Sequence, residues 1–188
     1  MWIWVAHYLN LTVMKGQNNM SELNFDFFSK SDVCSGNSAA IIDNGNGRIF
    51  QKVSLKPHTN YKLSCSLMLK ATDPLRISGY ALLGAYTTDK EDIISGDYPT
   101  NRITVDSTLL IQLSDVEDFY QEYSLIFNSE DNNEALIGIF HSPKAVKNVL
   151  YVDDFSLLED GSDKNILLNS SFEEDGAWTY IGASKKDC

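Results

Sequence analysis

The chain has 188 residues, of which 43% are hydrophobic and 11% aromatic, so it can bury a core and intrinsic disorder is not expected. This length suits one domain with an additional segment. The formal net charge of −11 disfavours partners that are bound through their negative charge, such as nucleic acids, anionic membranes and polyanionic glycans. Neutral polymers, cations and metal ions remain compatible with this charge.

The first part of the chain, residues 1–33, has no clear pattern. Apolar stretches at 2–13 and 23–28 can each form a strand, and we expect the opening strand of the fold there. The start lacks the basic region and cleavage site of a signal peptide, and no apolar run is long enough to cross a bilayer. A short strand is predicted at 38–43, and the Asn-Gly-Asn-Gly sequence at 44–47 is typical of a turn.

The clearest pattern is an alternation of hydrophobic and polar residues over 49–55 and again over 61–70. A period of two is typical of half-buried strands. The polar break between the two runs holds Pro57, which fixes its own φ and cannot donate a ladder hydrogen bond. We therefore predict a β-hairpin over 49–70. Cys65 falls in the hydrophobic phase of the second strand, so its side chain is expected to be buried.

Further alternating segments follow this predicted hairpin. A strand is expected over 74–88, and the charged stretch 90–101 is typical of a loop. No segment has a helical period, so the predicted fold is all-β, an antiparallel β-sandwich of jelly-roll type. The remaining predicted strands lie within 108–113, 119–128, 135–139 and 149–158.

Three stretches carry a resemblance to a known family. Residues 51–64 fit the pattern Gln-x-Val-x-Leu-x-Pro-x-Thr-x-Tyr-x-Leu-Ser, and 120–127 are similar to Trp-Gln-x-Tyr-Ser…Phe, with Tyr120 in place of the Trp. Residues 151–157 resemble a closing strand that contains two aspartates. In this order the stretches resemble carbohydrate-binding modules of the family four, nine and twenty-two group. The resemblance implies a galactose-binding-like jelly roll over 34–158 that binds glycans without chemistry.

The end of the chain resembles the start of such a module. After a polar linker at 159–164, the sequence Asn-Ile-Leu-Leu-Asn-Ser-Ser-Phe-Glu begins at Asn165 and is followed by Trp178. We consider two interpretations of residues 165–188. They are either the truncated start of a second module or a strand that packs on the first module.

Asp153 is the candidate metal ligand. The alternation places it in phase with Tyr151 and Phe155, toward the interior, and a buried carboxylate must be protonated, hydrogen-bonded or bound to a metal. The resemblance implies a structural calcium ion held by an aspartate of the closing strand, and Asp26 is a possible second ligand. The alternative is that Asp153 accepts hydrogen bonds from backbone N–H groups.

The candidate carbohydrate-binding residues are Arg76, Tyr80 and Tyr86, on the polar face of the strand at 74–88, and Phe140 in a later strand. A tyrosine ring matches the C–H face of a pyranose, its hydroxyl matches the rim, and an arginine can donate hydrogen bonds to sugar oxygens. The alternative is cross-strand packing, or burial of these rings beneath the loop at 90–101.

Gln51 and His141 also fall in the hydrophobic phase, and we expect both to be hydrogen-bonded in the core. The three histidines are scattered along the chain and no Gly-x-Ser-x-Gly sequence occurs, so no catalytic arrangement is apparent and an enzyme is not expected.

The predicted function is a non-catalytic module of a secreted, cell-surface or virion protein that binds a neutral oligo- or polysaccharide, and neither nucleic acid nor membrane. The alternative is a structural or adhesion domain of a larger assembly, such as a phage tail, that contacts neighbouring modules or subunits.

Overall fold

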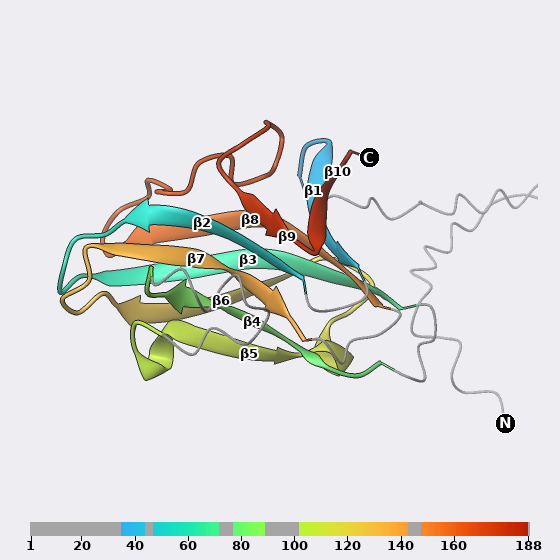
Figure 1. The fold of residues 1–188 in the computed structure, drawn as a ribbon, viewed down its shortest axis with the longest axis horizontal. Coiled ribbons are helices and arrows are strands. Elements are labelled where there is room, and N and C mark those ends of the chain that lie inside the picture. The colour runs from blue at the N-terminus through green and yellow to red at the C-terminus, as the bar shows by residue number, and fades with distance from the viewer. Residues whose placement is uncertain (1–34, 44–46, 72–76, 89–101, 143–147, 188) are drawn as a thin grey trace, which may run out of the picture.

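The computed structural model describes residues 35–43, 47–71, 77–88, 102–142 and 148–187. These residues form an antiparallel β-sandwich of two five-stranded sheets (Figure 1). The strands are β1 (Ser38–Asp43), β2 (Arg48–Ser54), β3 (Asn60–Ala71), β4 (Tyr80–Tyr86), β5 (Thr108–Gln112), β6 (Gln121–Asn128), β7 (Glu134–His141), β8 (Asn148–Glu159), β9 (Thr179–Ile181) and β10 (Ala183–Asp187), with two short 3-10 helices, η2 (Val105–Ser107) and η3 (Leu113–Asp115). The predicted all-β sandwich is confirmed.

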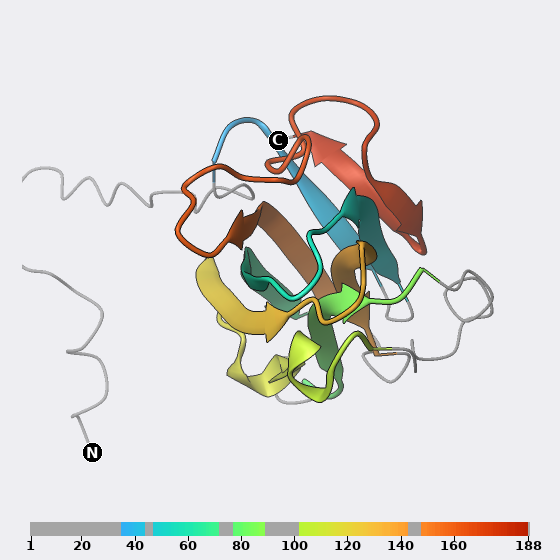
Figure 2. The same cartoon turned by 90° about the vertical axis from the view of Figure 1, so that its left-hand side faces the viewer.

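The first sheet has the strand order β10-β1-β8-β3-β6, and the second has the order β5-β4-β7-β2-β9. Figure 2 looks along the strands and shows the two layers facing each other. Alternate side chains of the long strands point between the layers, because a strand has a period of two, and most of these side chains are buried. Cys65 is among these core residues, as predicted. None of the described residues forms a helix of the length and hydrophobicity that a bilayer crossing requires.

The predicted hairpin over 49–70 is wrong in its pairing, although both of its strands exist. β2 pairs with β7 and β9, whereas β3 pairs with β6 and β8, so the two strands lie in opposite sheets. The connection therefore crosses from one sheet to the other. A hairpin and a crossing connection both need a short polar break between two strands with a buried face. The alternation alone does not distinguish them.

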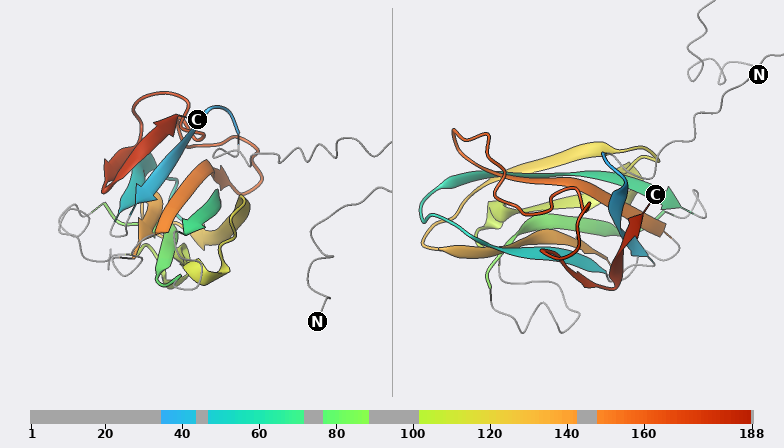
Figure 3. Two further views of the ribbon diagram at one scale, coloured as in Figure 1. Left: turned by 90° about the vertical axis from the view of Figure 1, so that its right-hand side faces the viewer. Right: turned by 90° about the horizontal axis from the view of Figure 1, so that it is seen from above.

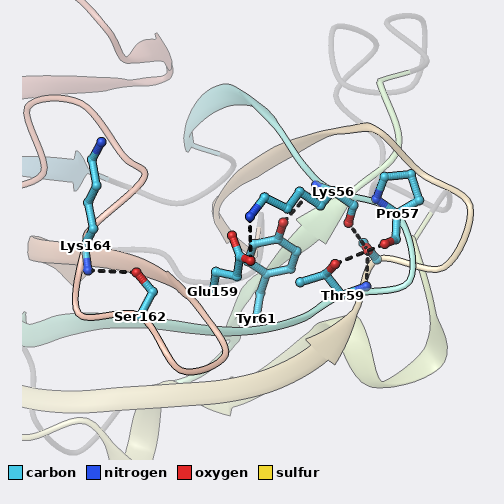
Figure 4. Close-up of polar contacts among 8 residues, drawn as sticks. Lys56, Pro57, Thr59, Tyr61, Glu159, Ser162 and Lys164 are labelled. Carbon is cyan, nitrogen blue, oxygen red and sulfur yellow. Dashed lines mark hydrogen bonds and ion pairs between the residues drawn. The ribbon is translucent and has the colours of Figure 1, made fainter.

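Side chains hold this crossing connection (Figure 4). The backbone N–H of Lys56 donates to the hydroxyl of Tyr61 at 2.8 Å, and the Lys56 ammonium lies 2.7 Å from Glu159 on β8. The hydroxyl of Ser129 donates to the Lys56 carbonyl at 2.7 Å and accepts from the N–H of Thr59 at 2.9 Å. Tyr61, whose ring stacks on Phe127, thereby links the connection to the core.

Residues 165–187 pack against the same sandwich. β9 extends the second sheet beside β2, and β10 extends the first sheet beside β1 (Figure 3). The rings of Phe172 and Trp178 enter the core, where their centroids lie 6.2 and 4.8 Å from that of Phe155. The segment thus contributes both edge strands and core side chains to the sandwich that the preceding strands form.

Candidate functional site

The outer face of the second sheet is apolar. On β4 the core receives Ala81, Leu83 and Ala85, so the residues between them point away from the core. A separate cluster forms on this outer side, and we call it the aromatic face. It consists of Phe50 on β2, Tyr80, Leu82 and Tyr86 on β4, and Leu136 and Phe140 on β7.

Two glycines lie side by side in the centre of the aromatic face. Gly84 is opposite Gly138 in the β4–β7 register. A Cβ atom at Gly138 would lie 2.1 Å from the carbonyl oxygen of Ile49 and 2.8 Å from the Cβ of Phe50, so a larger residue does not fit there. A Cβ atom at Gly84 would lie 2.7 Å from Cγ2 of Thr108, 2.8 Å from the carbonyl oxygen of Ser107 and 3.1 Å from the hydroxyl of Tyr86. These three groups, the end of the Tyr86 side chain among them, therefore occupy the space that Gly84 leaves.

Tyr86 and Phe140 form the buried centre of the aromatic face. Their ring centroids are 4.9 Å apart at an interplanar angle of 71°, an edge-to-face contact, and the side chains are 1% and 6% exposed. The Tyr86 hydroxyl is 3.4 Å from the carbonyl of Leu82, a long hydrogen bond, and burial raises the pKa of Tyr86. Phe50 and Tyr80 are half-buried, so their rings are the accessible parts of the aromatic face.

Charged groups border the aromatic face along β2 and β7. The guanidinium of Arg48 lies 5.9 Å from the centroid of Phe140, within the range of a cation–π contact. The ammonium of Lys52 is 2.7 Å from the carboxylate of Glu134, which also accepts a hydrogen bond from Thr88. Lys52 and Glu134 thus place a donor and an acceptor beside the aromatic rings, whereas the Arg48 side chain is buried.

Of the predicted carbohydrate-binding residues, Tyr80, Tyr86 and Phe140 lie together on the aromatic face, and Arg76 lies outside the described residues. Tyr86 and Phe140 are buried and pack on each other, as in the alternative of cross-strand packing. Phe50 and Arg48 were not among the residues predicted from the sequence. The signal that could have found them is the alternation along β2, which places both on the face opposite to Ile49 and Val53.

Asp153 was predicted to face the interior together with Phe155. This orientation is wrong, because the alternation along β8 changes between the two residues. The β3–β8 register pairs Ser64 with Ser156 and Ser66 with Asp153, so β8 carries one extra residue between these pairs. Asp154 lies at this bulge with φ of 47°. The bulge reverses the alternation, so Val152 and Phe155 both face the core. Asp153 thus points to the outer side of its sheet, yet its side chain is fully buried.

Backbone donors occupy both carboxylate oxygens of Asp153. Oδ1 accepts from the N–H of Asp154 at 2.7 Å, and Oδ2 accepts from the N–H of Ser35 at 3.2 Å. Oε1 of Glu173 binds the same turn, accepting from the N–H groups of Asn37 and Ser38 at 2.8 and 2.9 Å. These hydrogen bonds lower the pKa of Glu173. Asp153 and Glu173 therefore hold the chain at the start of β1.

The described residues do not complete a calcium site at Asp153. A calcium ion takes six to eight oxygen ligands. In the described part of the chain, no three His, Cys, Asp or Glu side chains are placed to share a metal ion. Asp26, the second predicted ligand, lies outside the described residues, so calcium binding stays a prediction.

Gln51 and His141 differ in their hydrogen bonding. The Gln51 side chain donates to the carbonyl of Leu168 and accepts from its N–H, both at 2.9 Å, so its predicted pairing is confirmed. His141 is 3% exposed, and neither ring nitrogen has a hydrogen-bond partner among the described residues, so its predicted pairing is not found there. Burial lowers the pKa of His141 to about 4.

The comparisons with known proteins identify similar structures but no family. No family model matches the chain, and no curated protein matches it. A solved structure described as "PbXyn10C CBM APO" is 14% identical, with a TM-score of 0.46, over 80% of this chain and 85% of that chain. "CBM4 structure and function" is 11% identical, with a TM-score of 0.47, over 65% and 71% of the two chains.

A third structure, "Family 16 Carbohydrate Binding Module-2", is 18% identical, with a TM-score of 0.42, over 66% of this chain and 79% of that chain. These descriptions name the class of module that the sequence motifs resemble. Because every one of these TM-scores is below 0.5, the function has to be argued from the residues of this chain.

Proposed function

We propose that this protein is a non-catalytic module that binds a neutral oligosaccharide or polysaccharide on the aromatic face. The observation that carries the proposal is the apolar, aromatic character of this outer face. The solvent side of an antiparallel sheet is ordinarily polar, because only the other side faces a core. Here three neighbouring strands place aromatic rings on it. Tyr86 and Phe140 are buried in this cluster, whereas Phe50 and Tyr80 stay partly exposed and are suited to stacking on a ligand.

The half-buried rings of Phe50 and Tyr80 supply the stacking surfaces. The C–H face of a pyranose packs on such a ring, and the hydroxyl of Tyr80 can hydrogen-bond to the sugar rim. Lys52 and Glu134 border the rings with a donor and an acceptor, whereas Arg48 is 3% exposed and packs over Phe140. The net charge of −11 supports a neutral rather than an anionic glycan, since an anionic chain would be repelled.

Binding without chemistry is supported by the pairing of Glu134. Its carboxylate forms an ion pair with Lys52 and accepts from Thr88. Glycoside hydrolysis ordinarily uses two carboxylates that flank the scissile bond, one as an acid. We also propose that the module acts in a secreted, cell-surface or virion protein, where glycan chains are exposed.

Retention on gels that contain neutral polysaccharides tests this proposal. We expect Phe50→Ala and Tyr80→Ala each to weaken binding by about tenfold, which is the loss of one aromatic stacking contact. Phe119→Ala is the matched control, because Phe119 is 42% exposed but does not belong to the aromatic face. If both variants keep the parent's circular dichroism and full retention, the aromatic face is not the glycan site.

A structural or adhesion domain is the second candidate function. The burial of Tyr86 and Phe140 favours it, because rings that pack on each other in this way stabilise a sheet without a ligand. Absence of binding to every neutral glycan of a broad array, with a folded protein, would support this candidate over the first.

A further inference from the structure

The four edges of the two sheets differ in how they are protected. An edge strand carries unpaired N–H and C=O groups that can pair with another chain, and proteins protect such edges with short strands, lysines or covering segments. β9 has three residues. β5 has five residues and lies between η2 and η3. β10 carries Lys185 and Lys186. Each of these three edges therefore has a recognisable form of protection.

The fourth edge, β6, is neither short nor provided with lysines, although the 3-10 helix η2 lies beside part of it. It has eight residues without a proline and with Glu122 as its one charged residue. It pairs with β3 from Gln121 to Asn128, and among the described residues no strand pairs with its other side. In Figure 2, β6 forms a lateral border of the sandwich. The side chain of Ile126, which points to solvent, is 68% exposed.

The sequence of β6 is compatible with pairing to itself. If two copies pair in the antiparallel direction with Leu125 opposite Leu125, Ser124 of each copy lies opposite Ile126 of the other. Glu122 then lies opposite Asn128, so no like charges face each other. Such a contact uses the same residues on both copies, as a two-fold dimer requires.

We propose that β6 is a pairing edge that binds β6 of a second copy of this chain, so that two five-stranded sheets join into one continuous sheet. The contact is small in comparison with the roughly 1,200–2,000 Å² that stable complexes bury, so the dimer forms at high protein concentration. This proposal uses the edge of the first sheet and does not depend on glycan binding by the second.

Analytical ultracentrifugation and amide hydrogen exchange of the full chain test this proposal. Across a roughly hundredfold range of protein concentration we expect a monomer–dimer equilibrium, in which the amides of 121–128 gain protection as the dimer forms. Ile126→Lys should weaken dimerisation by about tenfold or more, since lysine on an edge strand opposes pairing. Leu168→Lys is the matched control, because Leu168 is also 68% exposed but lies in the C-terminal segment.

Circular dichroism shows whether both variants remain folded, which their exposure leads us to expect. Two results would overturn the proposal. One is a monomer over the whole concentration range with unchanged exchange in β6. The other is a dimer that Ile126→Lys leaves intact and whose protection maps to another strand. Protection over β4 and β7 would instead make the aromatic face a protein interface and would count against its role in glycan binding.

Discussion

Two buried polar side chains in the core of this sandwich differ in their hydrogen bonding. Gln51 and His141 both face the interior. Gln51 pairs with the backbone of Leu168, whereas the described part of the chain holds no partner for His141. A buried imidazole without hydrogen bonds cannot accept a proton without a large loss of solvation. His141 is therefore neutral in the folded protein over most of the acidic range, and its titration opposes folding at low pH.

The replacement His141→Leu should make stability less dependent on pH. The unfolded chain protonates His141 near pH 6.5, whereas the folded chain does so near 4. Between these values the unfolded state binds more protons, so the free energy of unfolding falls as the pH falls, by about 3 kcal/mol in total. Urea unfolding at several pH values measures this loss. An unchanged pH profile in the variant would show that His141 titrates normally in the folded state.

Asp153 and Glu173 hold the chain before β1 by accepting backbone N–H groups, and Asp153 does so while fully buried. We expect Asp153→Asn to lower the free energy of unfolding by about 1–3 kcal/mol, because the neutral amide loses charge-assisted hydrogen bonds. Ser156→Asn is a control on the same strand. Melting in EDTA and in calcium chloride separates the two roles of Asp153. A melting temperature that calcium raises in the parent and not in Asp153→Asn would assign a calcium ion to this residue.

At the scale of elements, side chains that pair with backbone groups join the C-terminal segment to the sandwich. Gln51 binds both backbone groups of Leu168, and the amide of Asn165 accepts from the N–H of Leu157 and donates to the carbonyl of Phe155. The indole of Trp178 donates to the carbonyl of Asn169 at 2.8 Å. These contacts fix the segment along β8 before it reaches the sheet edges as β9 and β10.

Gln51→Ala should loosen this segment. The replacement leaves the N–H and C=O of Leu168 unpaired, and we expect a loss of about 2 kcal/mol in the free energy of unfolding. Gln112→Ala is the matched control, because Gln112 is an exposed glutamine on β5. Faster amide exchange confined to residues 165–187 in Gln51→Ala is the expected signature. Equal exchange in the two variants would mean that the core side chains hold the segment without Gln51.

At the scale of the whole molecule, both sheets and the C-terminal segment share one core. Leu167, Phe172 and Trp178 pack in the same cluster as side chains of the earlier strands. Strands that follow each other in the sequence also lie in different sheets, as β2 and β3 do. We therefore expect the described residues to unfold as a single cooperative unit.

Unfolding followed by two signals tests this expectation. In a variant with Trp2→Phe and Trp4→Phe, Trp178 is the one tryptophan left, so its fluorescence reports the segment while far-ultraviolet circular dichroism reports the sheets. Coincident transitions in urea are expected for one cooperative unit. A fluorescence transition that precedes the loss of β-structure would show that the segment folds separately from the sandwich.

The strands and their buried faces could be predicted from the sequence, because the period of two is a local property of the backbone. The alternation identified β1, β2 and β3 and most of β4 to β8, together with the burial of Cys65 and the outward phase of Tyr80 and Tyr86. The composition disfavoured an anionic partner without any knowledge of the fold, since the net charge is a sum over residues.

Other features depended on contacts between distant segments. Only the tertiary structure decided that β2 and β3 belong to different sheets, because the same alternation serves a hairpin and a crossing connection. It also decided the orientation of Asp153, since one extra residue in β8 reverses every side chain beyond it. The burial of Tyr86 over Gly84 and the pairing of Gln51 with Leu168 likewise required neighbours from elsewhere in the chain. A local period determines which face of a strand is apolar, whereas strand pairing determines what covers that face.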